Sequence, residues 1–231
     1  MRLFEKISQR TYKELEFLPK REVYPLDSFR TKCFYAIQLL GIVEDQTSDR
    51  KIKIEARKNF IINCVTATEV YFKDIVKILS VSPEVKESSD KIKELLKEKI
   101  RLWEAYVLFV KKKFRLGDVI NSIFSFQNLE EIDYVMSKIL NIKFLNLIED
   151  YKADLDEGDR EYYGVNSICL KTDLPKWRKY LAEVFRLRND FIHHISFRDR
   201  IGLNRLGILW ENLDAFITVV DDFISQYIPG E

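Results

Sequence analysis

Turn-forming residues are scarce in this chain, and their scarcity constrains the fold more than any other feature. Glycine occurs 7 times and proline 5 times among 231 residues. A chain of this length built from β-hairpins would need many more of them, because tight turns depend on these residue types. Between residues 48 and 79, apolar side chains recur at steps of three and four, as Phe72, Ile75 and Leu79 do, and this is the helical period. We therefore predict an all-α fold, a helical bundle.

Prolines, glycines and a charged stretch divide the chain into predicted helices. These helices cover residues 1–18, 28–40, 48–79, 89–114, 128–140, 175–194 and 203–227. Gly41 is expected to end the second helix, and the charged stretch 149–165, which holds two glycines, is expected to be a loop. Residues 1–45 are interpreted as an N-terminal helical extension of a domain over residues 46–231, the whole chain forming one compact unit.

The charge of the chain is almost balanced, with 38 basic and 37 acidic residues. Such a chain does not attract nucleic acid through its overall charge, so contact with RNA requires a local basic surface. One candidate lies between Lys91 and Arg115, where nine basic residues stand against three acidic ones. Runs of this kind are also common on the solvated face of a helix, and the sequence leaves both interpretations open.

The cysteines and the apolar runs indicate a cytoplasmic protein. Cys33, Cys64 and Cys169 show no C-x-x-C spacing, and an odd number without a framework is typical of a reducing compartment. The first ten residues lack the apolar core of a signal peptide, and no apolar run has the length of a membrane span. We therefore expect no contact with a membrane.

The chain contains only two histidines, and these are adjacent, at His193 and His194. A zinc site rich in histidine is therefore ruled out, and the sequence contains no glycine-rich phosphate loop. The strongest candidate for chemistry is the segment RNDFIH, from Arg188 to His193, which places arginine, asparagine, aspartate and histidine within six positions of one helix. We expect neither a metal nor another cofactor.

On a helical wheel, Arg188 lies in the middle of the apolar stripe of its helix. The apolar side chains within about 60° of it are Leu181, Val184, Phe185, Phe191, Ile192 and Ile195. A guanidinium in such a stripe needs a partner, because it stays charged when it is buried. The predicted partners are a carboxylate from another helix, with Glu69 as the first candidate, groups of a second subunit, or a bound phosphate.

The segment RNDFIH resembles the R-x4-6-H signature of HEPN domains, in which a polar residue such as Asn189 commonly follows the arginine. The matching histidine is His193, and His194 satisfies the looser form of the pattern. Two further stretches are similar to stand-alone bacterial HEPN proteins, ATEVYFKD at residues 67–74 and SFQN at residues 125–128. The resemblance, which extends from about residue 45 to the C-terminal helix, implies a HEPN-type bundle with extra N-terminal helices.

This resemblance implies a metal-independent endoribonuclease of the toxin or phage-defence kind. HEPN ribonucleases bring two copies of the motif together in a homodimer, where the ribose 2′-hydroxyl attacks the neighbouring phosphate. Arg188 would bind the phosphate and His193 would transfer a proton, since the ordinary pKa of histidine is about 6.5. The supporting residues would be Asn189, Asp190, His194 and Glu69. The implied partners are RNA, a second copy of the chain and a regulatory protein such as an antitoxin.

The sequence leaves three other interpretations open. In one, Arg188 forms a buried ion pair with Glu69, and the two histidines only stabilise the helix C-terminus through the helix dipole. In another, the chain is a non-catalytic HEPN module that binds RNA or a protein partner. In the third, it is a helical scaffold that binds no nucleic acid, which its balanced charge would suit.

Overall fold

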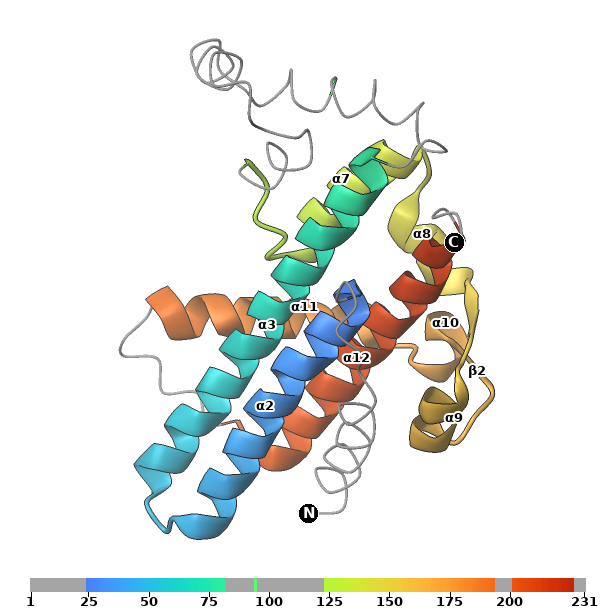
Figure 1. The fold of residues 1–231 in the computed structure, drawn as a ribbon. Coiled ribbons are helices and arrows are strands. Elements are labelled where there is room, and N and C mark those ends of the chain that lie inside the picture. The colour runs from blue at the N-terminus through green and yellow to red at the C-terminus, as the bar shows by residue number, and fades with distance from the viewer. Residues whose placement is uncertain (1–23, 82–93, 95–122, 194–200, 227–231) are drawn as a thin grey trace, which may run out of the picture.

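The structure, a computed structural model, describes residues 24–81, 94, 123–193 and 201–226. Within these residues the fold is all-α, which confirms the predicted fold class, and a two-stranded sheet is the sole β-structure. Four long helices form the main body (Figure 1): α2 (Pro25–Gln46), α3 (Arg50–Val81), α11 (Trp177–His193) and α12 (Leu203–Ser225). The smaller elements are α7 (Leu129–Leu140), α8 (Phe144–Asp150), β1 (Lys152–Asp154), α9 (Glu157–Tyr163), β2 (Ser167–Cys169) and α10 (Leu170–Asp173).

Two of the predicted helices cannot be compared with the structure. Those over residues 1–18 and 89–114 lie outside the described residues, apart from residue 94. The basic run from Lys91 to Arg115 lies there as well. None of the helices in the described part of the chain is both long enough and apolar enough to cross a membrane.

α2 and α3 form an antiparallel hairpin (Figure 1). Pro25 occupies the start of α2, where its fixed φ suits a helix and its missing N–H is not needed. At the other end of the hairpin, Asp49 Oδ1 accepts a hydrogen bond of 2.7 Å from the backbone N–H of Lys51 and so caps the start of α3. The hairpin therefore begins and turns at residues whose chemistry suits those positions.

The prediction that Gly41 ends the first helix of this hairpin is wrong, because α2 continues to Gln46. A glycine inside a helix costs only about 1 kcal/mol relative to alanine. Two contacts near it outweigh that cost: Leu40 is fully buried, and Glu44 accepts a hydrogen bond of 2.6 Å from Arg57 Nε on α3. Tertiary packing has thus extended the helix past a residue that disfavours it.

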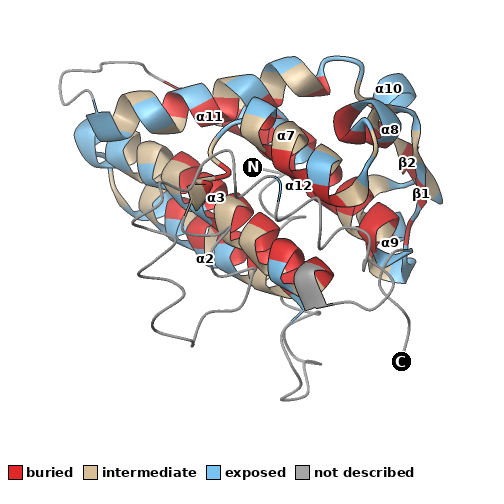
Figure 2. Cartoon of the chain, turned by 90° about the horizontal axis from the view of Figure 1, so that it is seen from above, coloured by how far each residue is buried: buried red, intermediate tan, exposed pale blue. Residues whose placement is uncertain are grey.

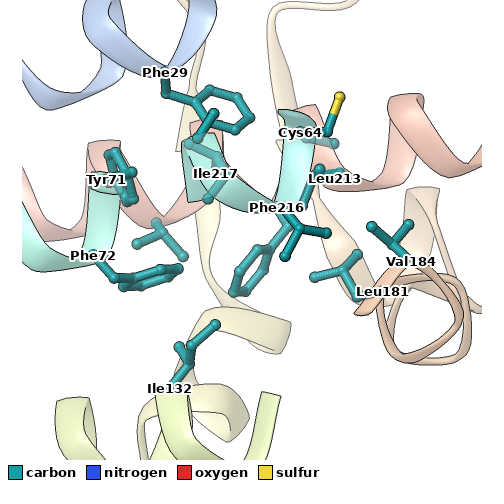
Figure 3. Packing of buried hydrophobic residues seen from close by; sticks show 14 of the residues in the cluster. Phe29, Cys64, Tyr71, Phe72, Ile132, Leu181, Val184, Leu213, Phe216 and Ile217 are labelled. Atoms are coloured by element: carbon teal, nitrogen blue, oxygen red, sulfur yellow. The ribbon is translucent and has the colours of Figure 1, made fainter. Parts of the chain in front are cut away.

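α12 is the central helix of the hydrophobic core. Between Leu206 and Val220, only Ile208 and Glu211 are exposed, as expected for a helix that other elements surround. Figure 3 shows side chains of α2, α3 and α11 converging on Leu213, Phe216 and Ile217 of this helix. Burial of each such large apolar side chain contributes about 1.5–3 kcal/mol to stability. α2, although it belongs to the predicted N-terminal extension, shares this core with α3 and α12.

α11 packs on α3 and α12 through one face (Figure 2). Its buried side chains are Trp177, Leu181, Val184, Phe185 and Leu187. The apolar stripe predicted for this helix is confirmed at its beginning, and in the last turn Phe191 still packs against the core, but Ile192 is 41% exposed. The physical reason is that the last turn contacts the core on the side of Phe191, and Ile192 lies about 100° away around the helix.

The charged stretch after residue 149 is folded, so the prediction of a loop is wrong. β1 and β2 pair antiparallel with Ala153 opposite Ile168, and both of these side chains are buried. Between the strands, Asp156 Oδ1 caps α9 by accepting a hydrogen bond of 2.7 Å from the Asp159 N–H. Gly164, with a φ of 72°, ends that helix in the left-handed region. The stretch combines exposed charges with a minority of buried residues, which explains why composition alone suggested a loop.

Candidate functional site

Arg188 lies on the side of α11 that approaches α3 and is half-buried. Its Nη1 donates a hydrogen bond of 2.8 Å to Oε1 of Gln127, which lies in the loop before α7. Its Nε is buried without a hydrogen-bond partner. Within the described part of the chain the guanidinium forms no ion pair. Among the described residues its hydrogen-bond partner is therefore a neutral amide, which does not neutralise the charge of the guanidinium.

Gln127 connects Arg188 to the long helix α3. Its Nε2 donates a hydrogen bond of 2.9 Å to Oε2 of Glu69, while Oε1 of Glu69 pairs with Lys73 Nζ at 2.6 Å. We call Arg188, Gln127, Glu69 and Lys73 the Arg188 cluster. Within the cluster, the carboxylate of Glu69 is paired with Lys73, and Arg188 is bonded to a neutral amide. The predicted direct ion pair between Arg188 and Glu69 is replaced by a contact through the amide.

The loop that carries Gln127 is held in an unusual conformation. Phe126 has a φ of 54°, a region that bulky residues rarely adopt and that costs about 1–3 kcal/mol. Its ring is buried and stacks on Phe72 of α3, with 6.1 Å between the ring centroids. The Glu131 carboxylate accepts hydrogen bonds from Ser125 Oγ at 2.6 Å and from the Phe126 N–H at 2.9 Å. These contacts fix the backbone on the N-terminal side of Gln127.

Asn128 fixes the other side of Gln127 by capping α7. Its Oδ1 accepts a hydrogen bond of 2.7 Å from the Glu131 N–H, and together with the contacts of the Glu131 carboxylate this resembles a capping box. Gln127 therefore lies between two fixed residues, Phe126 with its buried ring and Asn128 at the N-cap of α7. Such a constrained loop can present an amide to Arg188 without much loss of conformational entropy.

The other residues of the RNDFIH segment face outward. Asn189 and His193 are exposed, and they lie on the same flank of α11 because they are four positions apart. Asp190 is half-buried and pairs with Arg186 Nη1 at 2.6 Å. Arg188 and His193 differ by about 140° around the helix, so the first approaches α3 while the second is open to solvent. His194 lies outside the described residues.

The structure thus joins some of the predicted site residues and separates others. Arg188 and Glu69 belong to one hydrogen-bonded cluster, whereas Asn189, the next residue, and His193, more than one turn further along α11, are exposed to solvent. Gln127 and Lys73 were not predicted as site residues. One signal for Gln127 was available, since the spacing of Asn128 and Glu131 is that of a helix N-cap and marks the preceding residues as a structured loop.

Comparison of the chain with protein-family models gave no match, and no curated protein and no solved structure matched it either.

Proposed function

We propose that this chain is a metal-independent endoribonuclease of the toxin or phage-defence kind that acts as a homodimer. The observation that carries the proposal is the charge of Arg188, which is half-buried next to a neutral amide and forms no ion pair within the described residues. A phosphate oxygen would supply the missing negative charge, and a guanidinium can bind two such oxygens at once. The resemblance of RNDFIH to the HEPN signature supports the same assignment.

In the proposed reaction, the ribose 2′-hydroxyl attacks the adjacent phosphorus while its proton passes to a histidine. The bond from phosphorus to the 5′-oxygen breaks, and that oxygen takes a proton from water, which leaves a 2′,3′-cyclic phosphate. Arg188 stabilises the negative charge that develops on the phosphate oxygens. His193 is exposed at the end of α11 and is therefore accessible to RNA.

A second copy of the chain is part of the proposal. Because Arg188 and His193 point about 140° apart on one helix, one chain does not bring both to the same phosphate. A two-fold axis that places the ends of two α11 helices together would let the arginine of one copy face the histidine of the other. Asn189, beside His193, would then orient the imidazole or the substrate.

The experiment is cleavage of a structured RNA in the presence of EDTA. The wild type should cleave, and both Arg188→Ala and His193→Ala should lose about 10²–10⁴-fold in rate, as expected for removal of a phosphate ligand or a proton-transfer group. The matched control is Lys179→Ala, which removes a cation from an exposed position of the same helix and should cleave as the wild type does. An intact substrate with the wild type contradicts the proposal. Loss of cleavage in His194→Ala with full activity in His193→Ala would show that the histidine assignment is wrong.

A second candidate function is a non-catalytic module that binds RNA or a protein partner such as an antitoxin. A row of exposed apolar side chains on α2 favours it: Tyr35, Leu39 and Ile42 are 60%, 55% and 52% exposed. They recur at steps of four and three and so lie on one face of the helix, and exposed apolar rows are typical of interaction surfaces. RNA that is bound but left intact by the wild type, with weaker binding by Arg188→Ala, would favour this second function.

A further inference from the structure

A cavity of about 450 Å³ lies between the N-terminal ends of α3 and α12. Its lining includes Ser48, Arg50, Lys53, Arg57, Ile201 and Gly202. Three of these side chains are cationic and all three come from the first two turns of α3. Cavities of this size commonly hold small ligands, and this one is lined by groups that bind anions.

One carboxylate, Glu44, compensates part of this positive charge. It pairs with Arg57 Nε at 2.6 Å and with Lys53 Nζ at 3.4 Å. Burial alone would raise the pKa of Glu44, but the guanidinium of Arg57 and the ammonium of Lys53 outweigh burial and hold the pKa below its usual range. Glu44 therefore stays ionised and compensates one charge. Two of the three positive charges therefore remain uncompensated by Glu44. One of them is that of Arg50, which is exposed and forms no ion pair within the described residues.

The N-terminus of α12 adds backbone donors to this cavity. Its cap residue is Gly202, which has no side chain to accept hydrogen bonds from the first turn. The first N–H groups of a helix carry a partial positive charge and bind anions. Arg57 Nη1 donates a hydrogen bond of 3.1 Å to the carbonyl of Ile201, so this end of α12 is held against α3. By contrast, Asp49 already caps the N-terminus of α3.

The cations of the cavity continue along α3 toward the end of α11. Lys58, the residue after Arg57, has its Nζ 5.8 Å from the centre of the Phe191 ring. Phe191 is two positions from His193, and the distance from Arg50 to Lys58 along the axis of α3 is about 12 Å. Lys58 also pairs with Glu55 at 2.7 Å, which compensates its charge, so the stretch of α3 from Arg50 to Lys58 connects the cavity with the end of α11 that carries the exposed histidine.

We propose that this cavity binds a phosphate group of the RNA strand, outside the phosphate that is cleaved, through Arg50 and the first N–H groups of α12. RNA as the source of the phosphate rests on the proposed function, whereas the phosphate chemistry of the cavity does not. Because Arg50 forms no ion pair within the described residues, it can turn toward a phosphate without breaking a contact that stabilises the fold.

The test is binding of a fluorescein-labelled single-stranded RNA to the His193→Ala protein, which removes turnover, at several salt concentrations. Arg50→Glu should weaken binding by about 5–10-fold, and Arg50→Ala should reduce the slope of log affinity against log salt by about 0.7, the value for one phosphate contact on a single strand. Lys51→Glu is the matched control, since it makes the same charge change at the neighbouring exposed residue outside the cavity lining. Its effect should stay below about twofold, because it alters only the general electrostatic field.

The outcomes separate this inference from the proposed function. Equal losses of RNA affinity in Arg50→Glu and Lys51→Glu would overturn the inference. So would an Arg50→Glu variant that binds RNA normally but binds inorganic pyrophosphate more weakly, because the cavity would then be assigned to a small phosphate. Arg50→Glu can also be made in the protein that keeps His193. If this variant cleaves RNA with the KM of the wild type, the inference is overturned and the proposed nuclease function stands. Selective loss of RNA binding in Arg50→Glu, with no cleavage by any form of the protein, would support the cavity and contradict the nuclease.

Discussion

Arg30 and Arg188 each reach a residue that is distant in sequence, and the partners of these two arginines differ. Arg30 of α2 donates through Nη2 to both carboxylate oxygens of Asp159, at 2.9 and 3.0 Å, and to Thr218 Oγ1 at 3.1 Å. Arg188 of α11 donates to the amide oxygen of Gln127. The Nε of each arginine is buried without a hydrogen-bond partner, so that feature does not distinguish them. The two arginines are distinguished by the charge of the partner, which is a carboxylate for Arg30 and a neutral amide for Arg188.

This difference separates a structural arginine from a candidate binding residue. The Arg30–Asp159 pair is almost fully buried, with 10% and 5% of the two side chains exposed, and its opposite charges cancel inside the protein. The pair attaches α9 to α2, and Arg30 also donates a hydrogen bond to Thr218, which belongs to α12. Arg188, in contrast, is half-buried and forms no ion pair within the described residues, and in the proposed function an anion from outside pairs with it.

The largest predicted effect on stability is that of breaking the neutralised pair. Asp159→Ala leaves the charge of Arg30 buried without its ion-pair partner and should lower the free energy of unfolding by about 3–5 kcal/mol. Urea unfolding measures this change, and Glu157→Ala, an exposed position of the same helix, is the control. Arg188→Ala should cost less than about 1.5 kcal/mol, since it removes one hydrogen bond to a neutral group. Equal losses in Asp159→Ala and Arg188→Ala would contradict the distinction between the two arginines.

A substitution of similar shape at Gln127 should give Arg188 a carboxylate partner, as Arg30 already has. Gln127→Glu places a carboxylate next to Arg188, so the guanidinium gains an internal counter-ion and has less affinity for phosphate. We expect RNA cleavage to fall by about 10-fold or more, and the free energy of unfolding to fall by about 1–3 kcal/mol because the hydrogen bond from Gln127 Nε2 to Glu69 is lost. The new carboxylate would also face Glu69, whose charge Lys73 already balances. Unchanged cleavage in Gln127→Glu would show that the charge of Arg188 is not used.

A smaller effect concerns Asp221, which lies near Arg30. It accepts a hydrogen bond of 3.0 Å from Tyr71 Oη, and burial is the main cause that raises its pKa from 3.8 to about 6. The folded protein therefore binds this proton more tightly than the unfolded chain does. The stability that results is fully present below about pH 4 and is lost as the pH rises through about 6.

Asp221→Asn should remove this pH dependence. At pH 7.5 the variant should be more stable than the wild type by about 1–3 kcal/mol, and at about pH 2.5 the difference should vanish, because the wild-type carboxyl is then protonated in both states. Urea unfolding at the two pH values gives the comparison. A variant that is less stable than the wild type at both would mean that the Asp221 charge stabilises the fold through Arg30.

The long helices could be predicted from the sequence, because the helical period of their apolar residues is a local property. The start of α7 also follows from local chemistry at Asn128. Gly41 and the charged stretch 149–165 were misjudged for one physical reason: local propensity favoured a break, and contacts with residues distant in sequence outweighed it. The Glu44–Arg57 pair and the Arg30–Asp159 pair are such contacts, and the second joins residues 129 positions apart.

For the candidate site, the helical wheel indicated that Arg188 would need a partner, but it could not identify that partner. Gln127 lies 61 positions away along the chain, and its approach depends on the left-handed backbone of Phe126, which the sequence does not reveal for a bulky residue. The prediction from the wheel also required that the core cover the whole apolar stripe to the end of the helix. In the last turn of α11 the core contacts Phe191 and leaves Ile192 and His193 exposed.

The most direct test of the account is to mix two inactive variants, Arg188→Ala and His193→Ala, and to measure RNA cleavage by the mixture. If each site takes its arginine from one copy and its histidine from the other, a mixed dimer keeps one intact combination. Random exchange then restores about a quarter of the wild-type activity, since half of the dimers are mixed and each has one of its two combinations. A mixture as inactive as its two components, after exchange of subunits has been verified, would contradict a shared site built from Arg188 and His193.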